Sequence, residues 1–315
     1  MTCDITLLVN PTAGRGRGAR AARPAVETLR GYGFTVRTVV GADAAEALRR
    51  AREAVAGGTG ALVAVGGDGM VSLALQAVAG TGTPLGVIAV GGGNDFARAT
   101  GLPIQDPGAA ARLIAASLKG DGGREVDLGR VGDPGPVDDP ERVGDVWFGT
   151  VLASGFDSRV NERGNRMRRP RGRLRYDLAM LAELAALKPV RYRMSLDGGP
   201  QREVEATLIA VGNTTSYGGG MRICAGAALD DGLFDITVVG PCSRTTLLTV
   251  FPRVYRGTHL GHRVVTTHRA ASVSLAAEGL TAYADGERLG PLPLTATTVP
   301  GAVRLLGTPG PGTGA

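Results

Sequence analysis

The alternation of short apolar runs with helix-like stretches over the first 120 residues limits the folds open to this chain more than any other feature. The apolar runs have the length and composition of buried strands, and the stretches between them have the spacing of amphipathic helices. Strands that alternate with helices form βαβ units, which place the strands parallel to one another in one sheet. The expected strands cover 3–9, 34–40, 61–65 and 84–90, and the expected helices cover 19–33, 43–58, 70–80 and 106–120.

The pattern changes near residue 125, beyond which most runs have strand character. A loop rich in proline, glycine and acidic residues covers 133–145, and helix-like pieces at 172–188 and 243–257 interrupt the later strands. Two domains are favoured because 315 residues are many for a single core. We therefore expect an α/β domain with a parallel sheet over 1–128, a β-rich sandwich domain over 129–306 and a disordered tail over 307–315.

Three glycine-rich loops follow expected strands, at 10–18, 66–69 and 91–98. In an open parallel sheet ligands bind at the carboxyl ends of the strands, so these loops should meet at one edge. Each loop precedes an expected helix N-terminus, whose free amides and positive dipole end favour phosphate, and glycine lets the backbone approach a phosphate closely. Neither the Walker motif nor the dinucleotide-binding glycine motif is present, so the loops predict a different kind of phosphate site.

Asp68 is a lone carboxylate inside the glycine-rich stretch "GGDG". A carboxylate beside bound phosphates is repelled unless a cation lies between them. We therefore expect Asp68 to meet a magnesium ion or the reacting hydroxyl. The alternative is that Asp68 caps the helix that starts near Met70, and both roles are compatible.

Five segments in succession resemble the diacylglycerol kinase catalytic family, in its soluble bacterial lipid-kinase branch. They are "NPTAGRGRG", "VGGDG", "PLGVIAVGGGNDFARATGLP", "GGGMRICAGAALDDGLFD" and "ADGERLGPLPLTA", and the resemblance covers about residues 3–306. It implies an N-terminal domain like those of NAD kinases and phosphofructokinases, a C-terminal sandwich domain and an active site between them. It also implies transfer of the γ-phosphoryl group of ATP to a lipid hydroxyl, with magnesium.

The resemblance also assigns roles to single residues. It makes Asp68 the main residue that binds the nucleotide or magnesium, and it makes Glu287 the general base. The local sequence around Glu287 also predicts a hairpin turn. A general base has to orient the acceptor hydroxyl and take its proton. A second, structural magnesium is implied at Asp231 and the backbone carbonyl of Leu233. The residues expected to bind the nucleotide are Asn10, Gly14, Gly66, Gly67, Gly69, Gly91, Gly92, Gly93, Asn94 and Asp95.

Five positions depart from the family pattern, two of them Ser72 and Leu73, where asparagine and glutamate are common. Met70 and Gly92 stand where the family usually has threonine, so two hydroxyls that could contact phosphates are absent. Ala228 stands where relatives have the first ligand of the structural magnesium. Because backbone amides can also bind phosphates, we expect altered nucleotide affinity more than lost activity.

Charge and composition bear on the partners and the compartment of the protein. The formal net charge is +6, and arginines cluster at 163–175, which indicates either attraction to phosphates or to an anionic membrane surface, or a solvated loop. No apolar run is long enough to span a bilayer, no signal peptide is recognisable, and the three cysteines have no metal-ligand spacing. We expect a cytoplasmic protein in peripheral contact with the inner face of the membrane, with no nucleic-acid partner; a homodimer stays open.

The sequence therefore favours an ATP- and magnesium-dependent kinase that acts on a lipid hydroxyl, with diacylglycerol as the leading acceptor. Another lipid alcohol such as a sphingoid base, or NAD, is an alternative acceptor for the same chemistry. A nucleotide- or lipid-binding protein without catalysis is the alternative from another class. The presence of both Asp68 and Glu287 argues against this last possibility.

Overall fold

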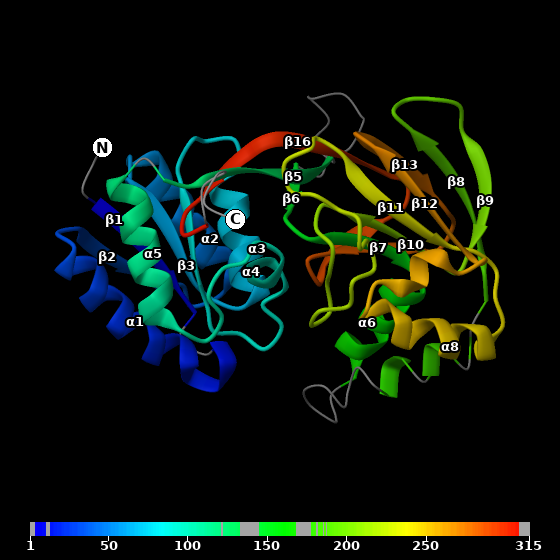
Figure 1. The fold of residues 1–315 in the computed structure, drawn as a ribbon, viewed down its shortest axis with the longest axis horizontal. Helices are drawn as coiled ribbons and strands as arrows, with labels where there is room; N and C mark the ends of the chain where they lie inside the picture. The colour runs from blue at the N-terminus through cyan, green and yellow to red at the C-terminus, as the bar shows by residue number, and fades with distance from the viewer. Residues whose placement is uncertain are drawn as a thin grey trace.

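The computed structural model describes residues 4–10, 13–120, 122–132, 145–167, 178–180, 182–184, 186 and 188–308. Figure 1 shows two domains, with the strands β5 and β16 running from one to the other. The expected α/β domain and β-sandwich domain are both present, so the predicted fold class is confirmed. None of the described helices combines the length and apolar character that crossing a bilayer requires.

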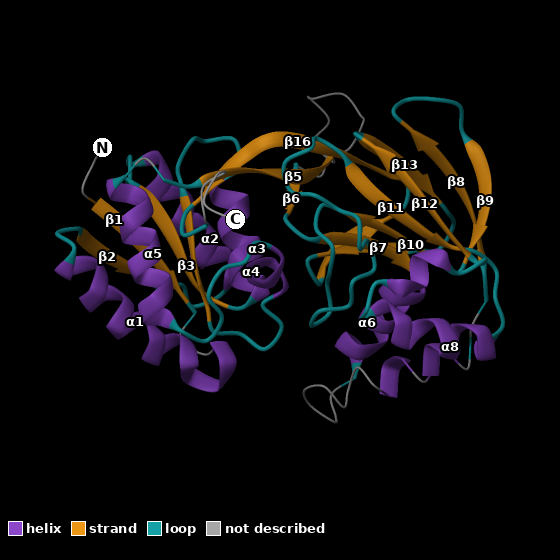
Figure 2. Cartoon of the chain, viewed as in Figure 1, coloured by secondary structure: helices purple, strands orange, loops and turns teal. Residues whose placement is uncertain are grey.

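The N-terminal domain is a parallel sheet with helices on both faces (Figure 2). Its strand order is β2-β1-β3-β4, and β3 is buried along its whole length, as a central strand between two helix layers must be. The strands are β1 (Asp4–Val9), β2 (Thr35–Val39), β3 (Ala61–Gly66) and β4 (Leu85–Ala89). The helices are α1 (Ala13–Gly31), α2 (Ala44–Ala56), α3 (Asp68–Val78), α4 (Asp95–Ala99) and α5 (Pro107–Lys119).

Two of the helix starts differ from the sequence prediction. Helix α1 starts at Ala13, so most of the stretch 10–18, which was expected to be a glycine-rich loop before a helix at 19–33, is part of the helix. Helix α3 starts at Asp68 with Gly67 as its N-cap, so the carboxylate of Asp68 stands in the first helical turn. By contrast, α2 and α5 start as predicted, after Asp43 and Asp106, which accept hydrogen bonds from the first turns of their own helices.

The C-terminal domain packs two sheets face to face. One is a six-stranded antiparallel sheet of order β12-β11-β10-β7-β14-β15, and the other contains β16, β13, β8 and β9 with β5 and β6. Phe148 stacks on Phe234 in the core between them, with ring centroids 5.7 Å apart. The strands are β5 (Arg124–Gly132), β6 (Val146–Phe148), β7 (Val151–Gly155), β8 (Val190–Leu196), β9 (Arg202–Ala206), β10 (Leu208–Gly212), β11 (Phe234–Val239), β12 (Val265–Ala270), β13 (Ser272–Ala276), β14 (Thr281–Ala284), β15 (Glu287–Pro291) and β16 (Leu294–Leu305).

Helices lie under the six-stranded sheet of this domain, on the side away from the sandwich core (Figure 1). They are α6 (Phe156–Arg166), α8 (Arg244–Val254) and the 3-10 helix η1 (Thr258–Gly261), with helical turns at 178–180 and 182–184. The expected helix at 172–188 is therefore described only in part. Of the arginine cluster at 163–175, only residues 163–167 belong to the described part of the chain.

The chain passes between the domains twice. The expected boundary at residue 128 falls inside β5, and β16 returns to the first domain, where Leu305 pairs with Leu85 of β4 in a continuous sheet. A local pattern cannot reveal this return, because it depends on pairing between residues far apart in sequence. Gly307 and Thr308, placed by the sequence prediction in a tail, are buried; residues 309–315 lie outside the described residues.

Candidate active site

The loops after β3 and β4 touch each other through their glycines. A Cβ atom placed on Gly91 would lie 2.4 Å from the Cα atom of Gly67, so neither loop could approach the other with a side chain at this point. The amide of Val90 donates to the carbonyl of Gly66 at 2.9 Å. Two of the glycine-rich loops predicted to meet at the carboxyl edge of the sheet therefore do so.

Asp68 holds the start of the neighbouring helix rather than capping its own. Its carboxylate accepts hydrogen bonds from the amides of Asn94 at 2.7 Å and Asp95 at 2.6 Å, which begin α4. Gly93 makes room for this arrangement, since a Cβ there would lie 2.6 Å from Asp68 Oδ2. The Asp68 carboxylate is thus fixed in position at the amino ends of two helices, α3 and α4.

Asn94 and Asp95 fix the second glycine loop in place. The Asn94 side chain accepts from the amide of Gly91 at 2.9 Å and donates to its carbonyl at 3.0 Å. The Asp95 carboxylate accepts from the amides of Gly219 at 2.7 Å and Gly220 at 2.8 Å, which belong to the other domain. Burial raises the pKa of Asp95, with a further rise from the charge of Asp68, while the two amide bonds oppose it.

A tight hairpin brings residues 285–287 from the C-terminal domain. Asp285 and Gly286 form the two-residue turn between β14 and β15, and both have positive φ, at 52° and 81°, as a type I′ turn requires. The Asp285 carboxylate accepts from the amides of Gly149 and Thr150, each at 2.8 Å, and from the Thr150 hydroxyl. Burial raises the pKa of Asp285, and these hydrogen bonds lower it. The local hairpin interpretation is therefore correct, and Asp285 anchors the hairpin.

The same hairpin places Glu287 against the first turn of α3. A Cβ atom placed on Gly69 would lie 3.3 Å from Glu287 Oε1, so the two residues are in contact. The Glu287 side chain is exposed and makes no hydrogen bond or ion pair with another described residue. Asp68 and Glu287, which are far apart in sequence, therefore come from different domains to the same place.

Comparison with known proteins gives the family. Residues 4–131 match the model of the diacylglycerol kinase catalytic domain, and residues 150–307 match the YegS C-terminal NAD kinase beta sandwich-like domain. A protein named diacylglycerol kinase from Mycobacterium tuberculosis (strain ATCC 25618 / H37Rv) is 46% identical over 303 residues, which cover 96% of this chain and 94% of that protein. The chain belongs to the diacylglycerol kinase catalytic family. The resemblance recognised in the sequence is thus confirmed.

More distant relatives agree in sequence or in fold. A protein named "Probable lipid kinase YegS-like" from Stenotrophomonas maltophilia (strain K279a) is 31% identical, over 93% of this chain and 93% of its own. A crystal structure of a diacylglycerol kinase from Bacillus anthracis superposes with a TM-score of 0.67 at 20% identity, with 96% of both chains covered. An NAD kinase from Archaeoglobus fulgidus in complex with ATP has a TM-score of 0.52 at 12% identity, over 97% of this chain and 92% of that one. The last two show likeness of fold alone.

The other residues expected to bind nucleotide lie at the same edge of the sheet. Asn10 follows β1, and its amide donates to the carbonyl of Val65 at the end of β3, at 3.3 Å. Gly14 lies in the first turn of α1. Gly92 is exposed, and a Cβ placed on it would have no neighbour within 4 Å. The nucleotide-binding roles of all these residues stay predictions, but the fold brings them together.

The two departures from the family's threonines differ in their consequences. The Met70 side chain is buried in the core of the N-terminal domain, where it packs with Val71 and Leu75. A side chain at position 70 that points into this core fills space. Position 92, by contrast, is open to the site. The lost hydroxyl at Gly92 is therefore the departure that can affect phosphate binding.

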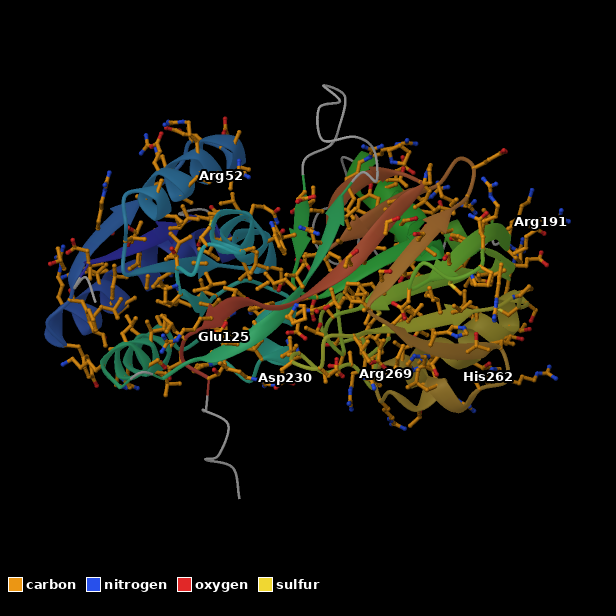
Figure 3. All side chains as sticks on the ribbon, turned by 90° about the horizontal axis from the view of Figure 1, so that it is seen from above. Arg52, Glu125, Arg191, Asp230, His262 and Arg269 are labelled. Carbon is orange, nitrogen blue, oxygen red and sulfur yellow. The ribbon has the colours of Figure 1, made fainter. Side chains whose placement is uncertain are left out.

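The expected structural magnesium site is organised differently from a metal site. One oxygen of Asp231 accepts from the amide of Leu233 at 3.0 Å, and the other pairs with the Arg269 guanidinium. Arg269 Nε also lies 3.4 Å from Asp235 Oδ2, and position 228 is an alanine without an oxygen ligand. The described residues contain no group of three or more acidic, histidine or cysteine side chains that could hold a metal ion. Asp231 and Leu233, with Arg269 paired to the carboxylate, therefore do not form a site that fits a divalent cation. Figure 3 labels Arg269.

Two residues that the sequence analysis missed join segments that are distant in sequence, and one of them, Gln76, joins the two domains. Buried Asp127 in β5 accepts from the amides of Gly232 at 2.7 Å and Gly301 at 2.9 Å. Gln76 of α3 donates to the carbonyl of Trp147 at 2.6 Å and accepts from its amide at 2.9 Å. No local signal in the sequence marks Asp127, because its segment "REVDLGRVG" contains several other charged residues that are not buried. No sequence pattern pointed to Gln76, because its partner is the backbone of Trp147, and a backbone partner leaves no mark in the sequence.

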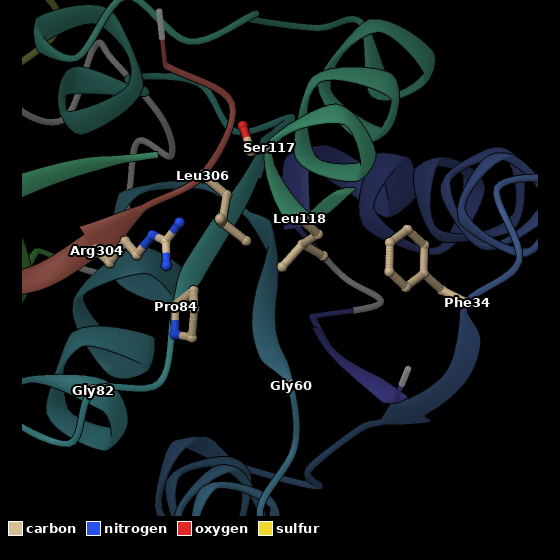
Figure 4. A pocket seen from close by; sticks show the side chains of 8 residues that line it. All are labelled: Phe34, Gly60, Gly82, Pro84, Ser117, Leu118, Arg304 and Leu306. Carbon is tan, nitrogen blue, oxygen red and sulfur yellow. The ribbon is translucent and has the colours of Figure 1, made fainter. Parts of the chain in front are cut away.

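A separate cavity of about 240 Å³ opens at the other end of the N-terminal sheet. Gly60, Pro84 and Phe34 line it, directly before β3, β4 and β2, and Arg304 projects into it (Figure 4). Because it lies at the amino ends of the strands, the sheet separates it from the glycine loops and Glu287. Its one charged lining residue, Arg304, donates to the carbonyl of Gly122 at 2.9 Å. This cavity does not belong to the candidate active site.

Proposed function

We propose that this protein is an ATP- and magnesium-dependent lipid kinase that phosphorylates the hydroxyl of diacylglycerol, giving phosphatidate. The observation that carries the proposal is the contact of Glu287 with the first turn of α3, next to Asp68. Membership of the family and the name of the Mycobacterium tuberculosis relative support it. The acceptor is an embedded lipid, so the proposal includes peripheral association with a membrane surface.

The glycine loops serve the nucleotide side of the reaction. Their amides and the amino ends of α3 and α4 offer donors to phosphate oxygens. Asp68 uses both carboxylate oxygens to accept backbone hydrogen bonds. Oδ1 accepts from the amides of Asp95 and Phe96, whereas Oδ2 accepts from the amide of Asn94 alone and keeps a lone pair for a metal ion or its water. The residue thus fits magnesium, which, when bound, neutralises negative charge on the phosphates.

Glu287 serves the acceptor side. Its carboxylate has no competing partner among the described residues, so it is available to accept a hydrogen bond from a lipid hydroxyl. As the bond from the acceptor oxygen to the γ-phosphorus forms and the bond to the β-phosphate oxygen breaks, Glu287 takes the hydroxyl proton. Asp285, anchored two residues earlier, holds the hairpin so that this carboxylate stays in position.

The test is ATP turnover with mixed micelles that each contain one candidate acceptor: diacylglycerol, monoacylglycerol, a sphingoid base, or NAD added in solution. Glu287→Gln removes the base and keeps the shape, and Arg288→Gln is a matched control at the exposed neighbouring position. We expect diacylglycerol-dependent turnover in the wild type and the control, and its loss in Glu287→Gln. Equal turnover in Glu287→Gln and wild type would overturn the role of Glu287. Turnover with another acceptor alone would overturn the substrate.

A further inference from the structure

Helix α8 presents an exposed apolar stripe to solvent. Leu248 is 55% exposed and Tyr255, directly after the helix, is 43% exposed. Exposed Pro252 lies between them, and the spacing of four and seven residues puts all three on one face. Leu247 and Val254 are buried on the opposite face, under the six-stranded sheet. The helix is therefore apolar on both its inner and its outer side.

Another exposed apolar side chain lies near this stripe. Leu178 is 41% exposed in the helical turn 178–180. The adjoining turn is tied to α6 by the ion pair of Glu183 with Arg163, at 2.5 Å, and these turns lie on the α6–α8 side of the domain in Figure 1. The remaining exposed large apolar residues of the described chain lie in the N-terminal domain on separate elements: Tyr32, Val40 and Leu113. The exposed large apolar side chains of the described C-terminal domain are therefore concentrated on α8 and next to it.

The chain segment that contains the stripe carries charge of one sign. No Asp or Glu occurs between Asp235 and Glu278, a segment that includes all of α8. The exposed side chains of Arg244, Arg253 and Arg256 make no ion pair with any described residue.

The surface of the other domain is organised in the opposite way. On α2 two of the three exposed arginines have a glutamate one turn away, Arg49 with Glu53 and Arg50 with Glu46, both at 2.5 Å, while Arg52 makes no ion pair with a described residue. Local ion pairs with glutamates of the same helix therefore satisfy most of the positive charge on α2. The arginines around α8 lack such pairs within the described chain, and this favours an anionic partner.

We propose that α8 lies flat on an anionic bilayer, with Leu248, Pro252 and Tyr255 in the interface and the arginines at the level of the headgroups. An amphipathic helix with apolar and basic residues on its outer face binds membranes in this way. The inference rests on the proposed function, because that function requires an acceptor drawn from a bilayer. A second copy of the chain is a poorer occupant, since two such faces would bring unpaired arginines together.

This orientation also suits the proposed chemistry. Helix α6 packs against β14, the strand that leads into the hairpin with Glu287, and α8 lies on the same side of the same sheet. A lipid leaving the bilayer under α8 and α6 therefore enters the domain that carries the general base.

The first experiment is co-sedimentation of the full chain with two kinds of vesicle: phosphatidylcholine alone, and equal parts of phosphatidylcholine and phosphatidylglycerol. One double variant carries Leu248→Ser and Tyr255→Ser, a second carries Arg253→Gln and Arg256→Gln, and the control carries Val40→Ser and Leu113→Ser in the N-terminal domain. We expect wild type and control to bind the anionic vesicles. At about 1 kcal/mol per arginine near such a surface, the arginine pair should lower the partition coefficient roughly thirtyfold.

The second experiment separates docking from chemistry. With a short-chain diacylglycerol dissolved as monomers, the α8 variants should turn over ATP like wild type, whereas with diacylglycerol in anionic vesicles their turnover should fall with their binding. If no lipid supports turnover but vesicle binding still depends on α8, the proposed function fails and the docking surface stands. If all variants bind vesicles like wild type, or if the α8 changes alter only the oligomeric state, the docking proposal is overturned.

Discussion

The carboxylates that the two domains supply to the candidate active site differ in their hydrogen bonding. On the N-terminal side, Asp68 and Asp95 each accept two short hydrogen bonds from backbone amides. On the C-terminal side, Glu287 lies beside them, exposed and without a partner in the described chain. The held carboxylates position loops, and Asp68 also keeps a lone pair on Oδ2 for a metal ion, whereas the free Glu287 keeps all its lone pairs for a substrate. The hydrogen-bond partners of an acidic residue therefore indicate whether it holds the site in shape or is available to the substrate.

The sharpest way to break this comparison uses two carboxylates of one hairpin. Glu287→Gln should lower kcat for lipid phosphorylation by about 10²- to 10⁴-fold, the usual worth of general-base help, and leave the melting temperature unchanged. Asp285→Asn should lower the free energy of unfolding by about 1–3 kcal/mol, because the amides of Gly149 and Thr150 lose an acceptor. Thermal melts and steady-state kinetics of both variants check this, and a large loss of stability in Glu287→Gln would contradict it.

Asp157 in α6 is a third kind of carboxylate, buried with its Oδ2 atom unpaired within the described chain. Burial raises its pKa from 3.8 to about 7. The folded protein thus holds a proton that the unfolded chain releases, so stability is lost as pH rises from about 4 to 7. The loss is at most about 4 kcal/mol by linkage. Denaturant unfolding should show Asp157→Asn gaining stability over wild type across this range. A difference that does not change with pH would refute the assignment.

Asp68→Asn tests the structural role of the hydrogen-bonded carboxylate on the N-terminal side. An asparagine keeps the shape but turns one acceptor into a donor, which then faces the amide of Asn94 or Asp95. We expect a loss of about 1–3 kcal/mol of folding free energy together with a large loss of turnover. Chemical denaturation and ATP-binding titration report the two effects separately. A variant as stable as wild type would mean that Asp68 is free, like Glu287.

Arg269 allows a test of whether an arginine stands in for a metal ion. It pairs with Asp231 and approaches Asp235, so the melting temperature of the wild type should not respond to EDTA. Arg269→Met should lower the free energy of unfolding by about 1 kcal/mol, since the pair is partly exposed, and added magnesium should restore part of the loss. Arg191→Met, at an exposed arginine of β8, is the control. A wild type that EDTA destabilises would instead support a metal at Asp231 and Leu233.

Substitution of Gly92 has the smallest expected effect, a change in ATP affinity. A Cβ fits there without contacts, so Gly92→Thr should fold like wild type and add a hydroxyl beside the glycine loops. One hydrogen bond is worth about 0.5–1.5 kcal/mol, which should tighten ATP binding roughly two- to tenfold. Gly92→Val has the same shape without the hydroxyl and should give no gain. Equal affinities for the threonine and valine variants, measured by calorimetry, would show that position 92 does not meet the nucleotide.

The sequence predicted the N-terminal domain well because its strands and helices are defined by local periodicity. The strands β1 to β4 lie within one or two residues of their expected ranges, and Asp43 and Asp106 mark helix starts in the expected way. What local pattern could not reveal is the partner of each polar group. Asp68 stood at a helix start, as a capping residue would, but its carboxylate binds the amides of another helix.

The C-terminal domain was predicted as a class but not in its connections. The return of β16 to β4, and the links made by Asp127 and Gln76, depend on residues that are distant in sequence. The proximity of Glu287 to Asp68 was expected only because the order of motifs resembled a known family. From the residues alone, 285–287 predicted a turn, which is also what the structure contains. Motif order thus supplied the long-range information that periodicity lacks.

A crystal structure with magnesium and a non-hydrolysable ATP analogue tests the central claim most directly. The account predicts that the terminal phosphate lies against the two touching loops at 66–69 and 91–93, with the metal beside Asp68 and the Glu287 carboxylate facing the γ-phosphorus. A nucleotide bound elsewhere, for instance in the cavity lined by Phe34 and Arg304, with Glu287 facing only solvent, would contradict it.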